Sequence, residues 1–464
     1  MKQYLTCIML VMTIVSYAQK GSVLSYEDYL NNVLQNSPLA KRAENEQQYG
    51  ALQYKAARGN YDPVISSDYN EKQFNGSHYF TNLQVEVKQP LFTSQYLRFG
   101  YDYGAGSYLN PELNTPSNGL SYLGLEVALL QGLLIDKRRA EVLKSKEYQQ
   151  YYKAEKQAQI NVLLLEASQH YFEWLFSIKQ ISLYTYFMGA ADQRLAGIKE
   201  LTNIGEKAAM DTIEAAIFFQ ARLLDMQNAR IENQKSINAI SFYNWQNNGL
   251  SFESEILEPA DSLEVYYNKL KFLVSEGINQ NGGTNPVLLK YQSFQRVLEI
   301  ENRLKKEMIK PYVSIKYNFI LNNSYSLNPV LSGKDYKVGL QISFPLFLRN
   351  PVNEYRMSRI HAENNAFELL NKTNELNVKM TVLKQTLALL NDQLKNAERS
   401  VLYSKLLVEA EKLKFDAGES SLFLLNTREN KWLESELKLS EYKLKYIKTA
   451  LNLIYLAGTL EYAI

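Results

Sequence analysis

The stretch LNVKMTVLKQTLALLNDQLKNAERSV, residues 376–401, places apolar side chains three and four positions apart along its whole length. The repeated positions are Leu376, Met380, Leu383, Leu387, Leu390, Leu394, Ala397 and Val401. This spacing is the heptad repeat of a coiled coil. The stretch lies within residues 352–464, which contain no proline and only two glycines, so very long helices are expected there.

Gly418 divides this proline-free segment. Beyond it, a second heptad stripe runs through Leu433, Leu437, Ser440, Leu444, Ile447, Leu451 and Ile454. Two heptad helices joined at a glycine predict an antiparallel helical hairpin, because glycine readily adopts the left-handed conformation that ends a helix. A kink within one continuous helix is the alternative.

The sequence of the first half of the chain predicts a second long helical hairpin. Residues 117–258 also lack proline. A stripe with heptad spacing runs through Ile160, Leu164, Ala167, Tyr171, Trp174, Ile178 and Ile181, and more weakly through Ile213, Ile217, Leu224 and Ile231. Asn203-Ile204-Gly205 marks the expected turn.

Between these helical segments the apolar period changes to two. At residues 83–88, Leu, Val and Val alternate with Gln, Glu and Lys, and residues 97–104 and 313–321 alternate in the same way. Such segments predict β-strands with one apolar and aromatic face and one polar face. We expect strands within 61–130 and 311–347, which gives four to six strands in the chain.

The two halves are related by an internal duplication. Pro38 and Pro286 precede corresponding helices, and Pro63 and Pro311 precede corresponding strands, both at an offset of 248 residues. We therefore expect a first structural repeat at 19–248, a connector at 249–285 and a second repeat at 286–464. Extra residues in the first repeat predict an additional strand pair, at about 80–92 and 95–109.

The N-terminus has the features of a signal peptide. Lys2 is followed by an apolar run at residues 5–15 and by Ser16-Tyr17-Ala18, so cleavage is expected after Ala18 and the signal at residues 1–18. Cys7, the only cysteine, lies inside this segment. The mature chain would then contain no disulfide. Lipid attachment at Cys7 is the alternative role for this residue.

Composition indicates neither an enzyme nor a nucleic-acid-binding protein. The 51 basic and 49 acidic residues give a net charge of +2 and form no polybasic block. The three histidines, His78, His170 and His361, are far apart in the sequence, and no phosphate-binding loop or nucleophile elbow is present. We expect no catalytic site, no cofactor and no metal site.

An exported chain with two-faced strands needs an environment for the apolar face. In lipid every backbone polar group must be paired, which only a closed barrel achieves for strands. Four to six strands cannot close around an open pore, so several copies would have to share one barrel.

Four stretches of the sequence resemble the TolC-like outer-membrane efflux proteins. They are Asn36-Ser37-Pro38-Leu39, AARGNYDP at 56–63, GEKAAMDTIEA at 205–215 and Pro345-Leu346-Phe347. Together with the duplication, the resemblance covers nearly the whole mature chain. It implies a mainly α protein with transmembrane β-strands, in which duplicated antiparallel coiled-coil hairpins form a periplasmic tunnel.

The resemblance also implies an assembly and a role. The protein would be a homotrimer in the outer membrane, with a shared β-barrel in outer-membrane lipid and the helical part in the periplasm. It would dock on a periplasmic adaptor protein and an inner-membrane pump and act as the passive, gated duct of a tripartite efflux or type I secretion system. The exported substrate, whether a drug, a metal ion or a protein, is left open.

The resemblance places adaptor docking at the hairpin turns. Gly205 and Gly418 match the turn glycines, and the docking positions beside them are Glu206, Ala208, Glu419 and Ser421. Asp211 and Glu214 match acidic positions of a possible gate, although acidic residues also favour any helix N-terminus. The second half keeps no such acids, since residues 424–427 read Leu-Leu-Asn-Thr.

A different class of function is the alternative: a periplasmic or surface coiled-coil scaffold that binds partners and conducts nothing. The apolar strand faces discriminate between the two, because a scaffold does not need them.

Overall fold

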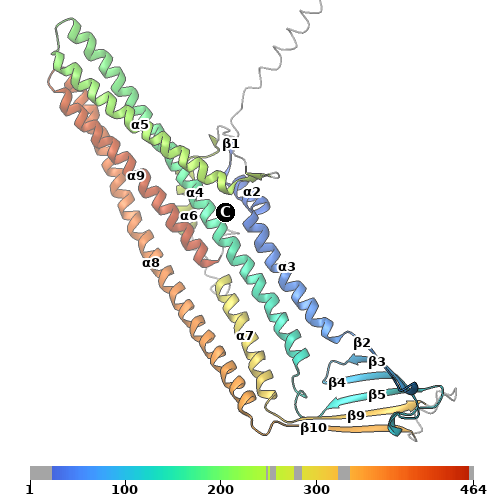
Figure 1. Ribbon diagram of the computed structural model, residues 1–464. Coiled ribbons are helices and arrows are strands. Elements are labelled where there is room, and N and C mark those ends of the chain that lie inside the picture. Colours follow the sequence, from blue (N-terminus) through green and yellow to red (C-terminus); the bar gives the residue numbers. More distant parts are fainter. Residues whose placement is uncertain (1–22, 247–248, 251–257, 276–284, 322–334, 459–464) are drawn as a thin grey trace, which may run out of the picture. The chain divides into compact units, whose positions relative to one another are not determined.

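The structure is a computed structural model that describes residues 23–246, 249–250, 258–275, 285–321 and 335–458 (Figure 1). The expected signal peptide, its cleavage site and Cys7 lie outside these residues. The chain divides into two compact units. One, the helical unit, combines Met1–Glu44, Gln157–Asn285 and Asn374–Ile464, and the other, the sheet unit, combines Asn45–Lys156 and Pro286–Thr373.

Two antiparallel helical hairpins build most of the helical unit. The first joins α4 (Lys137–Asn203) to α5 (Ala209–Tyr243), and the second joins α8 (Arg349–Asp416) to α9 (Leu422–Ala457). The C-terminal parts of α4 and α8 belong to this unit and their N-terminal parts to the sheet unit. Figure 1 shows the two hairpins as the long paired ribbons, in green and in orange to red. The hairpins predicted at Gly205 and Gly418 are therefore confirmed.

The predicted heptad stripes form the core of the helical unit. Leu387, Leu390 and Leu394 of α8 are buried together with Ile447 and Leu451 of α9 in one cluster. The same cluster contains Tyr171 and Trp174 of α4, both fully buried. It is completed by α2 (Tyr26–Asn36), which the hydroxyl of Ser25 caps, and by α6 (Leu263–Ser275).

The weaker heptad stripe lies on α5 but is not buried within the described chain. Ile213, Ile217, Leu224 and Ile231 are 55% to 67% exposed. The buried residues of α5 are instead Ala215, Met226, Ala229, Ile240 and Tyr243. The heptad pattern correctly identifies an apolar stripe, but within the described residues of this chain nothing covers it.

The sheet unit contains one six-stranded antiparallel sheet. Its strands are β2 (Val64–Phe74), β3 (Ser77–Pro90), β4 (Gln95–Ala105), β5 (Leu120–Ala128), β9 (Tyr312–Leu321) and β10 (Tyr336–Ser343). Their order is β10-β9-β5-β4-β3-β2, so the strands of the second half add to the meander of the first (Figure 1). The predicted extra pair corresponds to β3 and β4, and it lies within the same sheet.

Helices α3 (Pro38–Arg58) and α7 (Pro286–Glu307) precede the strands of the two halves. Pro38 begins α3 directly after α2 ends, and Pro286 begins α7, as expected from the fixed backbone angle of proline. The connections contain the short helices η1 (Gly59–Tyr61) and η2 (Pro111–Leu113). Strand β1 (Val23–Leu24) pairs in parallel with β8 (Glu258–Pro259), and β6 (Trp245–Gln246) pairs with β7 (Gly249–Leu250). The division into repeats and a connector stays a prediction.

In the part of the chain that the structure describes, no helix combines the length and the apolar character needed to cross a membrane.

Candidate functional site

The two faces of the six-stranded sheet differ in chemistry, because side chains alternate between faces along each strand. One row of paired residues that crosses all six strands consists of Ile65, Val87, Phe99, Leu123, Phe319 and Tyr336. Many side chains on this apolar face are open to the surroundings: Ile65 is 72% exposed and Leu340 64%. In a water-soluble protein, other parts of the chain normally cover such an apolar sheet face.

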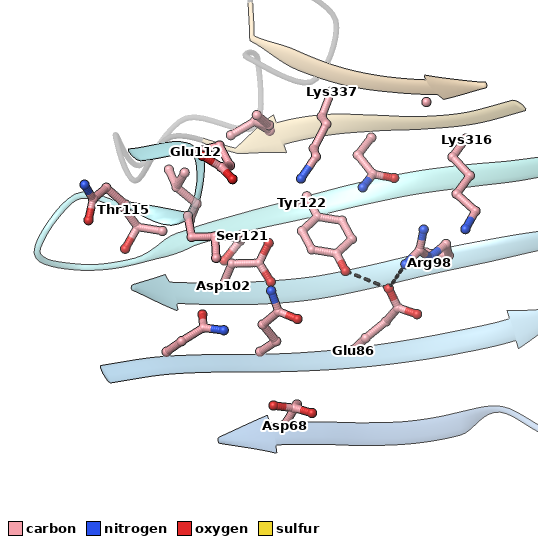
Figure 2. A pocket seen from close by; sticks show the side chains of 18 of the residues that line it. Asp68, Glu86, Arg98, Asp102, Glu112, Thr115, Ser121, Tyr122, Lys316 and Lys337 are labelled. Carbon is pink, nitrogen blue, oxygen red and sulfur yellow. Dashed lines mark hydrogen bonds and ion pairs between the residues drawn. The ribbon is translucent and has the colours of Figure 1, made fainter. Parts of the chain in front are cut away.

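The opposite face is polar and carries a connected network. Glu86 of β3 accepts hydrogen bonds from the Arg98 guanidinium and from the Tyr122 hydroxyl, the latter at 2.7 Å. Figure 2 shows these three side chains converging from β3, β4 and β5. The polar face lines a cavity of about 630 Å³, to which Asp68, Asp102, Lys316 and Lys337 also contribute.

The connection between β4 and β5 folds back against this polar face. The backbone N–H of Gly104 donates to Thr115 Oγ1 at 3.0 Å, and Thr115 N–H donates to Gly104 O at 3.1 Å. A Cβ atom at Gly104 would lie 2.2 Å from the carbonyl oxygen of Leu113, so only glycine allows this approach. Glu112 and Thr115 of the connection therefore line one side of the cavity.

The two edge strands of the sheet are unpaired on their outer sides. β10 pairs only with β9, and β2 only with β3, among the described strands. Every residue of β2 and of β10 is exposed. Because each strand is antiparallel to its neighbours and there are six, β2 and β10 run in opposite directions. Two such edges can pair with each other in an antiparallel ladder.

The two hairpin turns have the same backbone structure. Gly205 and Gly418 have φ angles of 82° and 77°, in the left-handed region. The following residues, Glu206 and Glu419, donate N–H bonds to Leu201 O at 2.9 Å and Lys414 O at 2.8 Å. Both turns are thus Schellman motifs, which explains why glycine is required at each.

The structure places the two turns side by side in the helical unit (Figure 1). Leu195 of α4, Ala215 of α5 and Leu422 of α9 share one buried cluster. The Lys207 ammonium lies 5.3 Å from the centre of the Phe415 ring, which links the turn after α4 to the end of α8.

The predicted docking residues divide between these turns. Glu206 and Ala208 follow Gly205, and Ala208 is the N-cap residue of α5 but makes no side-chain capping bond. Glu419 follows Gly418, and Ser421 caps α9 by accepting the N–H of Leu424 at 3.3 Å. All of these side chains except Gly205 and Gly418, which have none, are exposed.

The two acids proposed for a gate lie on α5. Asp211 is in its first turn and Glu214 is one turn further along. Both are half-buried. Their role in a gate stays a prediction.

Sequence reasoning missed the polar contact between the hairpins. Arg194 of α4 donates to Asn426 Oδ1 at 2.7 Å and to Glu429 of α9. These residues are more than 230 positions apart in the chain, and no spacing rule connects them. The polar network of the sheet, in contrast, could be found, because Glu86 and Arg98 occupy the polar positions of the alternation.

Ionisable side chains also take part in helix contacts elsewhere in the helical unit. Burial raises the pKa of the Tyr243 phenol to about 12, with the nearby Glu166 carboxylate adding to the effect. Burial would also raise the pKa of Glu173, but hydrogen bonds from Lys448 and His170 outweigh it and hold that pKa below its usual value. Glu173 Oε1 of α4 lies 2.5 Å from Lys448 Nζ of α9.

The histidines are not brought together. His78 lies in β3, His170 in α4 and His361 in α8. Across the described ranges, no group of three or more His, Cys, Asp or Glu side chains is arranged to hold a metal ion.

No protein-family model matches the chain. No curated protein sequence matches it either. Solved structures do match. The outer membrane protein VceC of Vibrio cholerae has a TM-score of 0.65 at 11% identity, over 93% of this chain and 95% of VceC. The CmeC outer membrane channel of Campylobacter jejuni has a TM-score of 0.63 at 13% identity, over 94% of this chain and 85% of CmeC.

The MtrE outer membrane channel of Neisseria gonorrhoeae gives a TM-score of 0.63 at 12% identity, over 93% of this chain and 88% of MtrE. At this identity the likeness shows the fold. The chain therefore has the fold of the TolC-like outer-membrane channels, as the resemblance implied.

Proposed function

We propose that this protein is one subunit of a homotrimeric outer-membrane channel that serves as the passive export duct of a tripartite efflux or type I secretion system. The observation that carries the proposal is the sheet, which has an exposed apolar face, a polar face and two free edges. The fold shared with bacterial outer-membrane channels supports it.

The apolar face requires lipid or another protein. Ile65, Phe99 and Leu340 are each more than half exposed and come from three strands across the whole sheet. Removal of this much apolar surface from water is strongly favourable. Lipid can cover the face only if no strand edge remains open to it, because an unpaired backbone group in hydrocarbon costs several kcal/mol.

Further copies of the chain satisfy this condition. Edge strand β10 of one copy can pair with β2 of the next, in the antiparallel sense that their directions require. The interface uses two different patches of the chain, and such head-to-tail contacts close into a ring. Three copies give a barrel of roughly 18 strands, in the range that leaves an aqueous channel. The polar face with Glu86, Arg98 and Lys316 would then line the pore.

The helical unit supports the same assembly. The stripe on α5, which we define as Met210, Ile213, Ile217, Leu224 and Ile231, is exposed along more than 20 residues of helix. α8 carries a comparable exposed set that includes Leu389, Leu402 and Leu413. Coiled-coil contacts between copies would cover both and form a periplasmic tunnel.

We further propose that the two turns form the periplasmic end of the duct and dock a periplasmic adaptor, which couples to an inner-membrane pump. Gly205, Glu206, Ala208, Gly418, Glu419 and Ser421 would make this contact, and Asp211 and Glu214 would contribute to the gate. The exposure of the docking residues and the adjacency of the two turns support the docking assignment. A coiled-coil scaffold without channel activity is disfavoured by the two-faced sheet.

A conductance measurement tests the channel. The purified protein in detergent should have the mass of a trimer, and its addition to a planar lipid bilayer should produce discrete conductance steps. Lys316→Glu and Lys337→Glu, which reverse charges on the polar face, should change the cation-to-anion permeability ratio. A protein that stays monomeric and monodisperse without detergent, and gives no conductance, would support the scaffold instead.

A further inference from the structure

A second cavity, of about 150 Å³, lies in the sheet unit where β4, β5 and β9 meet the beginning of α4 and the end of α7. We call it the junction pocket. Tyr96 and Tyr312 supply its aromatic lining, and Ile135, Leu304 and Met308 its apolar lining. Two charged side chains in its wall, Glu307 and Arg138, have unused hydrogen-bonding atoms.

Glu307 is the last residue of α7, and its side chain is 5% exposed. One carboxylate oxygen, Oε2, forms an ion pair with the Lys310 ammonium at 2.7 Å. The other, Oε1, is buried and has no hydrogen-bond partner among the described residues. A buried carboxylate oxygen without a donor is costly, so the site favours a ligand that supplies one.

Arg138, in the first turn of α4, offers the complementary group. Its Nη2 donates to Asp136 Oδ2 at 3.1 Å, and its guanidinium lies 4.1 Å from the centre of the Tyr96 ring. Nη1 is buried and, in the described part of the chain, donates to nothing. The side chain is 14% exposed, so water reaches this donor poorly.

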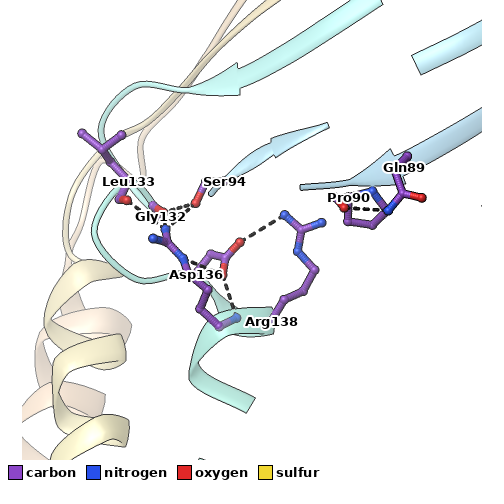
Figure 3. Close-up of polar contacts among 8 residues, drawn as sticks. Gln89, Pro90, Ser94, Gly132, Leu133, Asp136 and Arg138 are labelled. Carbon is purple, nitrogen blue, oxygen red and sulfur yellow. Dashed lines mark hydrogen bonds and ion pairs between the residues drawn. The ribbon is translucent and has the colours of Figure 1, made fainter. Parts of the chain in front are cut away.

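The turn that carries Arg138 is held in place. The neighbouring Arg139 donates to Ser94 Oγ at 2.8 Å, to Gly132 O at 2.6 Å and to Leu133 O at 2.8 Å. Figure 3 shows Asp136 and Arg138 beside Ser94, Gly132 and Leu133. The donor at Arg138 is therefore positioned before any ligand arrives, which lowers the entropic cost of binding.

The third acid of the lining, Glu126, does not need a ligand. Its carboxylate lies 3.2 Å from the Lys88 ammonium and 4.0 Å from that of Lys316. Among the described lining residues, the buried side-chain atoms without a hydrogen-bond partner are one acceptor, Glu307 Oε1, and one donor, Arg138 Nη1. A carboxylate oxygen and a guanidinium N–H that lack partners favour opposite ends of a zwitterion.

We propose that the junction pocket binds a small zwitterion with an ammonium group and a carboxylate group, such as a free amino acid with a short side chain. The ammonium group donates to Glu307 Oε1, and the carboxylate accepts from Arg138 Nη1. A cavity of roughly 150 Å³ holds a molecule about the size of benzene, which matches such an amino acid. The apolar wall accommodates its aliphatic carbon atoms.

The pocket lies against the polar face, because Tyr96, Glu126 and Tyr312 share that face with Glu86 and Arg98. In the proposed channel a solute would therefore reach it from the duct. The binding itself does not depend on channel function, so the two proposals can fail separately.

Binding to the purified full-length protein tests the proposal, with L-alanine as the probe and propionate and ethylamine as probes that each lack one charged group. Titration calorimetry and saturation-transfer NMR should detect saturable binding of L-alanine with a dissociation constant on the order of 1 mM. Propionate and ethylamine should bind at least about tenfold more weakly, because each leaves one buried hydrogen-bonding atom, Glu307 Oε1 or Arg138 Nη1, without a partner.

Two substitutions test the contacts of the ammonium and carboxylate groups separately. Glu307→Gln should abolish the preference for L-alanine over propionate, and Arg138→Gln should abolish the preference for L-alanine over ethylamine. Glu299→Gln, an exposed position on the same helix, is the matched control and should bind like the wild type. A merely structural role of either residue would alter thermal stability without changing these preferences.

Circular dichroism and particle mass establish that each variant is folded. The proposal is overturned if L-alanine does not bind the wild-type protein, which would mean that water alone fills the pocket. It is equally overturned if folded Glu307→Gln and Arg138→Gln proteins bind the three probes as the wild type does.

Discussion

Arg194 of α4 and Glu429 of α9 form an ion pair that joins the two helical hairpins near their turns. Their side chains are only 13% and 9% exposed. Asn426 accepts a second hydrogen bond from the same guanidinium group. The ends of the two hairpins are thus held together by a desolvated polar contact in addition to the apolar cluster around Leu195.

Removal of one partner should destabilise the helical unit. Arg194→Ala leaves the Glu429 carboxylate buried without its cation, which we expect to lower the free energy of unfolding by about 3 kcal/mol. Urea unfolding followed by circular dichroism measures the change. Lys395→Ala is the control, because Lys395 and Asp392 form an exposed pair, 68% and 74% exposed, that should contribute less than about 0.5 kcal/mol. Equal effects of the two substitutions would contradict the structural role of the Arg194 contact.

The exposed stripe on α5 should be a contact between copies. Ile217 is 67% exposed, so Ile217→Asp should leave the helices of one chain folded but prevent trimer formation. Light scattering in detergent measures the particle mass, and circular dichroism the helix content. Lys235→Asp places the same charge at an exposed position on the same helix that already carries a charged side chain, and should remain trimeric. A trimeric Ile217→Asp protein would show that the stripe lies outside the contact.

The Glu173 contact should make stability depend on pH in the acid range. Its pKa is lowered in the folded protein by Lys448 and His170, so the carboxylate contributes stability above the ordinary value of 4.5. That contribution is lost as the pH falls through the lowered folded value. The melting temperature of the wild type should therefore fall more steeply below about pH 5 than that of Glu173→Gln.

Glu398→Gln, at an exposed position of α8, is the matched control and should follow the wild type. Parallel curves for the wild type and Glu173→Gln, measured in the same buffers, would mean that Lys448 does not stabilise the charged form of Glu173.

The two faces of the sheet should respond differently to one positive charge. Phe99 is 51% exposed on the apolar face, near the middle of β4. Phe99→Arg should destabilise the folded protein in lipid by about 2–4 kcal/mol if this face meets the bilayer. Asp68→Arg puts the same side chain on the polar face and should have little effect. Urea titration in lipid vesicles compares them, and equal losses would argue against a lipid-facing surface.

Most of the fold follows from periodicity in the sequence. The heptad positions from Leu376 to Leu394 and from Leu433 to Ile454 identify helices that the structure confirms, and Gly205 and Gly418 mark both turns. The alternation at residues 83–88 and 97–104 identifies strands and both of their faces. These features are local, so a single sequence contains them in full.

The partner of each apolar stripe is not a local property. Ile213 and Ile217 belong to a heptad stripe like that of the buried Leu387 and Leu390, yet they are exposed in the described structure. Periodicity reports that a stripe is apolar and does not report which chain covers it. Contacts such as that of Arg194 with Glu429, and the convergence of Glu307 and Arg138 on one pocket, depend on the packing of distant segments. No spacing rule could have predicted them.

Disulfide crosslinking of the two edge strands tests the central claim most directly. One cysteine is placed on the polar side of β2, at Ser66, Asp68 or Asn70, and one on the polar side of β10, at Lys337, Gly339 or Gln341. Cys7 is the only native cysteine. If copies of the chain close a shared barrel, at least one combination should give crosslinked dimers and trimers in outer membranes and no larger species. Monomers in every combination, or a ladder that continues beyond three subunits, would contradict the shared barrel.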